Sequence, residues 1–405
     1  MQTQTTDHYL STAEGQEADE IIRSCVHCGF CTATCPTYQL LGDELDSPRG
    51  RIYLIKQMLE GQKFSQKTQQ HLDRCLSCRS CETTCPSGVQ YGRLIDIGRE
   101  LVDKQVSRLL LDRIQRFVLR KILPFPNRFS FLLKTGQLLK PLLPALIKQK
   151  IPDQQKVIFK PEQSLNRKML VLQGCAQSVA TPNTNNATAN ILHKLGIELI
   201  AANRAGCCGA ISQHLSAPQE ALNFMRRNID AWWPMIEQGA EAIVITASGC
   251  GVIVKEYGHL LKYDVDYADK AQKISELAKD ISEILTEENL AIERINLSTK
   301  KIVFQSPCTL QHGQQLDGVV ESLLKRCGFI LKPIEDAHLC CGSAGTYSIL
   351  QKKISQQLLQ NKLTVLQKHK PELIVTANIG CQLYLQTQAN VPVKHWIELL
   401  DESFI

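Results

Sequence analysis

Two cysteine runs near the N-terminus share one spacing that is typical of metal-cluster binding. The first run comprises Cys25, Cys28, Cys31 and Cys35, and the second comprises Cys75, Cys78, Cys81 and Cys85. Both read C-x2-C-x2-C-x3-C-P, the pattern by which bacterial ferredoxins hold two [4Fe–4S] clusters. Zinc sites instead draw pairs of ligands from separated segments. We therefore predict two cubane clusters and not zinc sites or disulfides.

The fourth cysteine of each run lies outside the short loop that wraps a cubane. It precedes a proline, which suits the first position of a new helix. In two-cluster proteins this fourth cysteine ligates the other cluster. The predicted ligand sets are therefore Cys25, Cys28, Cys31 and Cys85 for one cubane, and Cys75, Cys78, Cys81 and Cys35 for the other.

The second half of the chain contains an internal repeat built around further cysteines. Buried-strand patterns at 168–172 and 301–305 lead into Cys175 and Cys308, and a Cys-Cys-Gly follows further along each copy. A helix pattern and a second strand come next, ending at Cys250 and Cys381. Strands that alternate with amphipathic helices predict parallel α/β packing in each copy. The cysteines would then lie at the carboxyl ends of strands, where α/β folds build their sites.

Adjacent cysteines can both bind one metal cluster, so the repeat cysteines form a candidate site. They are Cys175, Cys207, Cys208, Cys250, Cys308, Cys340, Cys341 and Cys381. Either an additional iron–sulfur cluster or thiol chemistry without metal is compatible with them. The remaining Cys327 suits a buried apolar position, and we assign no role to the scattered histidines.

Composition and charge limit the class of protein. The chain has 405 residues, of which 43% are hydrophobic and 21% charged, as in ordinary soluble proteins. Its polar N-terminus carries no apolar signal region, and no apolar stretch approaches the roughly 18 residues that span a bilayer. We expect a cytoplasmic chain whose cysteines are reduced or metal-bound.

The net charge of +6 is concentrated in residues 101–150, which hold eleven lysines and arginines against two aspartates. Prolines punctuate residues 122–166, which predicts short helical pieces. This basic and apolar mixture fits a surface that touches anionic lipid or a partner, or equally a linker whose charges face water.

These patterns predict five segments. They are a mobile lead at 1–20, an α-helical dicluster ferredoxin domain at 21–100, a basic helical linker at 101–166, and cysteine-rich repeats at 167–295 and 296–405. Between the cysteine runs, Asp46 or Ser47 is predicted to cap a helix that Gly61 ends. Its presence favours the all-helical form of dicluster domain. A second helix is predicted to run from beyond Cys85 to about residue 121.

No nucleotide-binding motif is present. The chain lacks both G-x-G-x-x-G after a strand and G-x-x-x-x-G-K-[ST], and we expect no nucleic-acid partner. Oxidation of an organic substrate requires a two-electron acceptor such as a flavin. We predict no flavin, NAD or catalytic residue on this chain, which would instead receive electrons from a partner subunit.

The order of parts resembles the family of glycolate oxidase (glycolate dehydrogenase) iron–sulfur subunits over the whole chain. The resemblance rests on the two dicluster runs, the segment DSPRGRIYLIKQMLEG and the two cysteine-rich repeats. It implies a complex in which FAD-binding subunits oxidise glycolate, and related 2-hydroxy acids, to glyoxylate. This subunit would pass the electrons towards a quinone or another acceptor at the cytoplasmic face of the inner membrane.

The wider superfamily supplies alternatives. It includes the iron–sulfur subunit of anaerobic glycerol-3-phosphate dehydrogenase, the lactate-utilisation proteins and a subunit of heterodisulfide reductase. The resemblance to heterodisulfide reductase implies, as one alternative, that this chain is a thiol/disulfide enzyme. The superfamily pattern ends each repeat in C-x-x-C, whereas this chain has Cys250 followed by Gly-Val-Ile and Cys381 followed by Gln-Leu-Tyr. Each copy therefore offers four cysteines in place of five, which disfavours a noncubane double cluster.

Overall fold

The computed structural model describes residues 1–144, 148, 151–155, 165–288 and 301–403. The chain forms two compact units. The first, here called the dicluster unit, comprises Met1–Val118, Gln213–Ala217 and His338–Lys362. The second, here called the α/β unit, comprises Leu119–Ser212, Pro218–Ala337 and Leu363–Ile405. None of the described helices is long and apolar enough to cross a membrane.

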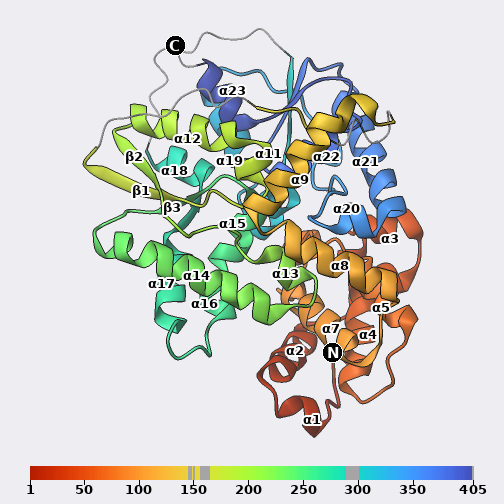
Figure 1. The fold of residues 1–405 in the computed structure, drawn as a ribbon. Coiled ribbons are helices and arrows are strands. Elements are labelled where there is room, and N and C mark those ends of the chain that lie inside the picture. Colours follow the sequence, from red (N-terminus) through yellow and green to blue (C-terminus); the bar gives the residue numbers. More distant parts are fainter. Residues whose placement is uncertain (145–147, 149–150, 156–164, 289–300, 404–405) are drawn as a thin grey trace. The chain divides into compact units, whose positions relative to one another are not determined.

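The dicluster unit is helical throughout its described residues (Figure 1). Its helices are α1 (Asp7–Leu10), α2 (Ala13–Ser24), α3 (Pro36–Leu41), α4 (Pro48–Leu59), α5 (Gln66–Asp73), α6 (Ser80–Thr83), α7 (Tyr91–Gln105) and α20 (Tyr347–Leu350), with 3-10 turns η1 (Phe30–Thr32) and η2 (Glu44–Asp46). Helices α8 (Leu110–Ile122) and α21 (Lys352–Gln367) belong partly to this unit. The all-helical dicluster fold predicted from the sequence is confirmed.

Helix α4 forms where the sequence predicts it. The Ser47 side chain accepts a hydrogen bond from the Gly50 amide at 3.0 Å, which satisfies one of the free donors of the first turn. Ile52, Ile55 and Leu59 are buried on one face of the helix. Of the two capping residues that the sequence offered, the structure uses Ser47.

Residues 1–20, which the sequence predicts to be a mobile lead, contain α1 and the start of α2, and several of their side chains are buried. Thr12 caps α2 by accepting from the Gly15 amide, and Ala18 and Ile22 are completely buried in the core of the dicluster unit. The buried Asp19 carboxylate accepts hydrogen bonds from two threonine hydroxyls of the N-terminal segment. The composition of this segment is mostly polar, so the sequence analysis missed the short apolar stripe by which it packs against this core.

The single helix predicted from Cys85 to about residue 121 is two helices, α7 and α8. Arg108 lies in the break and forms ion pairs with Asp73 at 2.6 Å, Asp103 at 2.6 Å and Asp112 at 3.1 Å. Arg116 also contacts Asp73, at 3.1 Å. Part of the excess positive charge of residues 101–150 is therefore neutralised within the chain.

The α/β unit contains two parallel sheets. Its strands are β1 (Arg167–Val171), β2 (Ile197–Ala201), β3 (Ile243–Ile245), β4 (Ala278–Asp280), β5 (Ile302–Gln305), β6 (Leu373–Thr376) and β7 (Val393–His395). The first sheet has the order β2-β1-β3-β4 and the second β5-β6-β7, and all pairs are parallel. The repeated parallel α/β architecture predicted from the sequence is confirmed.

Helices connect these strands. They are α11 (Gln177–Ala180), α12 (Pro182–Lys194), α14 (Pro218–Glu237), α15 (Ser248–Lys255), α16 (Tyr257–Leu260), α17 (Ala268–Leu277), α18 (Ile281–Glu287), α19 (Val319–Arg326), α22 (Ile379–Gln386) and α23 (Trp396–Ser403), with a π-helical turn η4 (Thr309–Gly313). Helix α13 (Ala210–His214) belongs partly to this unit.

The segment before β1 contains α9 (Pro126–Leu139) and the 3-10 turn η3 (Lys140–Leu142). These are the short helical pieces that the prolines predict, and the rest of the predicted linker falls partly outside the described residues. Phe131 and Leu138 of α9 are exposed. The choice between a docking surface and a plain linker stays open.

Both faces of the first sheet are buried, and the strands alternate between two cores. Met169 and Val244 face one core, whereas Leu170 and Ile243 face the other. Side chains of β5 and β6 in the second repeat join the core that contains Met169. The two repeats therefore share one hydrophobic core, into which Cys327 is also buried as predicted.

Candidate iron–sulfur centres

The two cysteine loops adopt the same unusual backbone conformation. In the first loop, His27 and Gly29 have φ angles of 58° and 87°; in the second, the equivalent Ser77 and Arg79 have φ angles of 51° and 60°. Left-handed backbone at a non-glycine residue is costly and concentrates at functional sites. Alternating right- and left-handed residues turn successive amides towards a common concavity, an arrangement found at iron–sulfur sites. The matching conformations indicate that both loops are built to wrap an anionic group.

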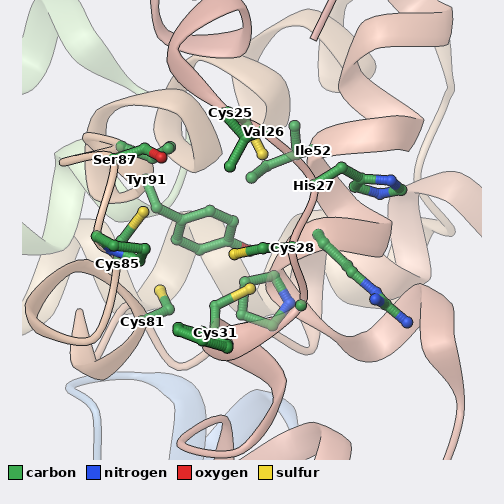
Figure 2. Close-up of a pocket in the computed structure, with 16 residues that line it drawn as sticks. Cys25, Val26, His27, Cys28, Cys31, Ile52, Cys81, Cys85, Ser87 and Tyr91 are labelled. Atoms are coloured by element: carbon green, nitrogen blue, oxygen red, sulfur yellow. The ribbon is translucent and has the colours of Figure 1, made fainter.

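The first loop lines a cavity that is partly open to solvent. The cysteines that line it are Cys25, Cys28, Cys31, Cys81 and Cys85. Figure 2 shows the Tyr91 ring between them, with Val26 and Ile52 at the margin. Cys28 is exposed and Cys25 is buried, so the cavity opens to solvent on one side.

The second loop lines a second cavity, which is also partly open to solvent. The cysteines that line it are Cys35, Cys75, Cys78 and Cys81. Arg51, Thr37 and Tyr91 complete the wall, and the Tyr91 hydroxyl donates to the Cys75 sulfur at 3.7 Å. Cys35 and Cys75 are both buried, whereas Cys28 of the first cavity is exposed.

The cavities bring together the two cysteine sets that the spacing predicts. Each cavity takes three cysteines from its own loop and the fourth from the other run, and Cys81 and Tyr91 line both. Clustered thiols in such cavities fit [4Fe–4S] cubanes. The assignment of each cysteine to a particular cluster stays a prediction.

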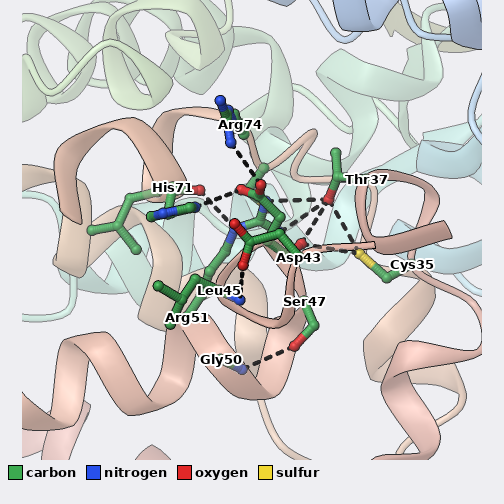
Figure 3. A network of polar contacts seen from close by, with 12 residues as sticks. Cys35, Thr37, Asp43, Leu45, Ser47, Gly50, Arg51, His71 and Arg74 are labelled. Carbon is green, nitrogen blue, oxygen red and sulfur yellow. Dashed lines mark hydrogen bonds and ion pairs between the residues drawn. The ribbon is translucent and has the colours of Figure 1, made fainter. Parts of the chain in front are cut away.

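A polar network centred on Asp46 adjoins the second cavity, because Thr37 and Arg51 belong to both (Figure 3). The Asp46 carboxylate is completely buried and meets His71 Nδ1 at 2.9 Å, Arg74 Nη1 at 2.7 Å and Arg51 Nη2 at 3.4 Å. The Thr37 hydroxyl donates to the Asp46 carbonyl at 2.9 Å. Sequence reasoning gave none of these residues a role at the clusters. The sequence did contain a signal for such a role, because Asp46 and Arg51 flank the start of the helix between the two cysteine runs.

Burial keeps two of the cavity thiols, those of Cys31 and Cys81, in their protonated form when no metal is bound. Burial is the main cause that raises the pKa of the Cys31 thiol, to about 11, and it raises the pKa of Cys81 well above the usual value. Burial alone would lower the pKa of Arg51, but Tyr91, Cys75, Cys35 and Asp46 raise it, so this guanidinium stays charged. Binding of a cluster must therefore displace protons from the thiols.

In the first repeat, the four predicted cysteines lie together beyond the sheet. Cys175 is hydrogen-bonded to Cys207, Cys207 to Cys208, and Cys208 to Cys250. The Cys207 bond and burial raise the pKa of Cys175 well above the usual thiol value. The sequence-based expectation that these cysteines converge from separate strand ends agrees with this chain of sulfurs.

The first Cys-Cys-Gly turn is held by α14 and α16. Asn228 Nδ2 donates to the Cys207 carbonyl at 2.9 Å, and the Tyr257 hydroxyl donates to the Cys208 carbonyl at 2.8 Å. Gly209 has a φ of +96°, and a Cβ there would lie 3.0 Å from the Ala221 carbonyl oxygen. The glycine therefore allows the backbone of α14 to approach the turn closely.

The cysteines of the second repeat are distributed between the two units. Cys308 and Cys381 belong to the α/β unit, whereas the Cys340–Cys341 pair lies in the dicluster unit. There the Tyr347 hydroxyl donates to the Arg74 carbonyl at 3.0 Å, next to the second cluster loop.

Comparison with known families agrees with the two parts of the chain. A family described as a 4Fe-4S dicluster domain matches residues 21–89, and a cysteine-rich domain matches residues 169–255 and 302–386. A crystal structure of a hypothetical protein from Helicobacter pylori has a similar fold, with a TM-score of 0.56 over 98% of this chain and 74% of that chain at 8% identity. Fold and site thus define an iron–sulfur electron-transfer protein with a duplicated cysteine-rich domain.

Relatives at higher identity specify the family. The glycolate oxidase iron–sulfur subunit of Escherichia coli is 55% identical over 100% of this chain and 99% of its own length. The chain belongs to the family of glycolate oxidase iron–sulfur subunits, and is thus a component of an oxidoreductase. A probable member from Bacillus subtilis is 30% identical over 90% of this chain and 88% of its own length. Lactate utilization protein A of Bacillus licheniformis is 25% identical over 56% of this chain and 96% of its own length.

Proposed function

We propose that this chain carries electrons from FAD-binding subunits that oxidise glycolate to glyoxylate, through two [4Fe–4S] clusters, towards a quinone. The observation that supports it most directly is the pair of adjoining cavities, which share Cys81 and Tyr91. Two clusters with a common wall permit one-electron steps inside the protein. The substrate is proposed from the 55% identical relative.

Within this proposal, one cubane is held by Cys25, Cys28, Cys31 and Cys85, and the other by Cys75, Cys78, Cys81 and Cys35. Each cavity contains its four proposed ligands, although Cys81 also borders the first cavity. When bound, the clusters supply reversible one-electron chemistry. The chain itself contributes the thiolate ligands, the left-handed loop residues that shape each concavity, and the burial that limits access of water.

The first test is the metal content and spectroscopy of the anaerobically purified chain. Iron, acid-labile sulfide and the electron paramagnetic resonance spectrum of the reduced protein should show at least about eight irons per chain and two interacting cubane signals. About four irons, or a spectrum without cubane signals, would contradict the two-cluster assignment.

Two alanine variants test the ligand exchange between the runs. Cys35→Ala should remove the cluster of the second loop and leave the signal of the first. Cys85→Ala should remove the cluster of the first loop and leave the signal of the second. Cys327→Ala is the matched control, because Cys327 is buried in the apolar core of the α/β unit and lines neither cavity, and it should retain both signals. If Cys35→Ala leaves the same surviving signal as Cys28→Ala, the exchanged assignment is wrong.

The role in the complex is tested by turnover. In the reconstituted complex, Cys28→Ala or Cys78→Ala should abolish electron delivery to a quinone while glycolate still reduces the flavin of the partner subunits. Lactate and glycerol 3-phosphate, tried in place of glycolate, distinguish the alternative donor substrates. Unchanged turnover in both variants would show that electrons bypass this chain.

A third iron–sulfur cluster at Cys175, Cys207, Cys208 and Cys250 is a second proposal. The hydrogen-bonded chain of these sulfurs supports it, and about twelve irons per chain would be expected. The alternative is a thiol/disulfide enzyme, but Cys207 and Cys208 are 1% and 2% exposed. A disulfide substrate could not reach them without rearrangement, so we favour the cluster.

We also propose a cytoplasmic location with peripheral association at the inner membrane. Exposed apolar residues of α8 and α9, such as Leu111 and Leu138, support this together with the basic residues around them. Replacing Arg113, Arg128 and Lys134 by glutamine should release the complex from anionic vesicles at low salt. Retention on the vesicles would leave this segment as a linker.

A further inference from the structure

Two arginines of α4, separated by one residue, face different cavities and differ in burial. Arg49 lines the first cavity, and its side chain is 33% exposed. Arg51 lines the second cavity, and its side chain is 1% exposed. A charge acts on its neighbours much more strongly when buried than when water screens it. The two cavities therefore differ in electrostatic environment.

Arg51 is held against the second cavity by several hydrogen bonds. Its Nε donates to the His71 carbonyl at 2.7 Å, and Nη1 and Nη2 each lie 3.2 Å from the Thr37 hydroxyl. That hydroxyl lies 3.3 Å from the sulfur of Cys35. The Thr37 hydroxyl thus connects the fixed guanidinium to Cys35, a proposed cluster ligand.

The buried and partly buried groups behind the second cavity carry more positive than negative charge. Arg51 and Arg74 both contact the buried carboxylate of Asp46, at 3.4 Å and 2.7 Å. The Asp43 carboxylate also lies within 4.8 Å of Asp46 and His71, but it is exposed, so water screens its charge. At the first cavity, Arg49 forms an ion pair with the partly exposed Glu44. That pair is neutral overall, and water reaches both partners.

We propose that Arg51 raises the reduction potential of the cluster in the second cavity above that of the cluster in the first. Reduction adds negative charge to a cluster and its thiolates, and a fixed buried cation stabilises the reduced form. The hydroxyl hydrogen bond from Tyr91 to Cys75 acts in the same direction. Electrons then enter at the first cavity, beside the exposed Cys28, and move to the second.

This inference rests on the proposed two-cluster function, and one experiment separates their failures. The holoprotein is titrated anaerobically with chemical mediators while electron paramagnetic resonance follows each cubane signal. Cys78→Ala, which should retain only the first cluster, identifies which signal belongs to which cavity. A wild-type protein without two cubane signals refutes the two-cluster function itself, before any potential is compared.

In Arg51→Gln, the equilibrium constant for reducing the second cluster should fall at least tenfold, which is about 59 mV for a one-electron couple. The first cluster should keep its potential. Arg49→Gln is the matched control on the same helix and should leave the second cluster unchanged. An unshifted second cluster in Arg51→Gln, or an equal shift of both clusters, overturns the inference while the two-cluster function stands.

Loss of the second cluster from Arg51→Gln would show in the iron content as a loss of about four irons. Arg51→Lys then decides, because lysine retains the charge without the shape of the guanidinium. A lysine variant that keeps both clusters and the wild-type order of potentials supports the electrostatic role. A lysine variant that also loses the cluster, or reverses that order, shows that Arg51 acts through its shape, and the inference is wrong.

Discussion

Removing the carboxylate of Asp46 should destabilise the dicluster unit more than any single exposed substitution. Asp46 is 0% exposed and is the carboxylate that Arg51, Arg74 and His71 share. The substitution Asp46→Asn keeps the size and one carbonyl acceptor but removes the negative charge. Arg51, with its side chain 1% exposed, would remain a buried cation without its counter-ion.

The size of the effect follows from the burial of the partners. Breaking a buried ion pair by removing one partner costs about 3–5 kcal/mol, because the other charge stays buried. The Arg74 side chain is 24% exposed and can regain water, and asparagine still accepts one hydrogen bond. We therefore expect the lower end, about 3 kcal/mol of unfolding free energy.

The assay must report on this unit alone, because a chain with two units and bound clusters does not unfold in one step. Hydrogen–deuterium exchange of the α4 and α5 amides measures the opening free energy locally. Asp7→Asn is the matched control, since Asp7 is exposed and its loss should cost less than about 0.5 kcal/mol. A loss below about 1 kcal/mol for Asp46→Asn would refute the claim that this network depends on the carboxylate.

Three further predictions concern the helix between the cysteine runs and the α/β unit. Ser47→Ala should cost about 1 kcal/mol in the opening of α4, because it removes the cap; protection equal to wild type would show that the cap is dispensable. In urea titrations, Gly209→Ala should lower the free energy of unfolding more than Gly196→Ala does. Both glycines have a positive φ, but of the two only Gly209 has a backbone oxygen within 3.0 Å of the added Cβ. Equal losses in the two variants would contradict this. Burial lowers the pKa of His395 to about 4, so on acidification the unfolded state binds the proton before the folded state does. The contribution of neutral His395 to the free energy of unfolding is therefore intact above pH ~6.5. It is lost as the pH falls towards about 4, and the loss is about 3 kcal/mol. His395→Gln should flatten this part of the pH dependence, and an unchanged slope would show that His395 does not cause it.

The His395 prediction is best read as a difference between variant and wild type. Asp280 is also buried, and burial raises its pKa to about 6, so its neutral form adds stability as the pH falls through that range. The two effects oppose each other in the wild-type profile. Subtracting the His395→Gln profile isolates the histidine, whose Nε2 lies 2.9 Å from the Thr246 carbonyl oxygen and whose Nδ1 accepts from the Ile397 amide at 3.2 Å.

Local patterns in the sequence determined the elements and the chemistry. Cysteine spacing is a property of a few consecutive residues, so it predicted two cluster loops, and the loops at 25–31 and 75–81 share one backbone conformation. Capping by Ser47 and the strand patterns before Cys175 and Cys308 were equally local, and α4, β1 and β5 formed where expected. The repeat predicted a parallel α/β architecture for the same reason.

Only the tertiary structure decided which charges and cysteines meet. Burial depends on segments distant in sequence, so nothing local distinguished Arg51, which is buried, from Arg49, which is partly exposed. The sequence of the N-terminal helices predicts a polar lead, whereas in the structure their few apolar side chains pack into the core of the dicluster unit. The Cys340–Cys341 pair matched the first repeat in sequence yet lies in the dicluster unit. Spacing along the chain specifies ligands and helices, whereas electrostatic environment arises from packing between residues that the chain keeps far apart.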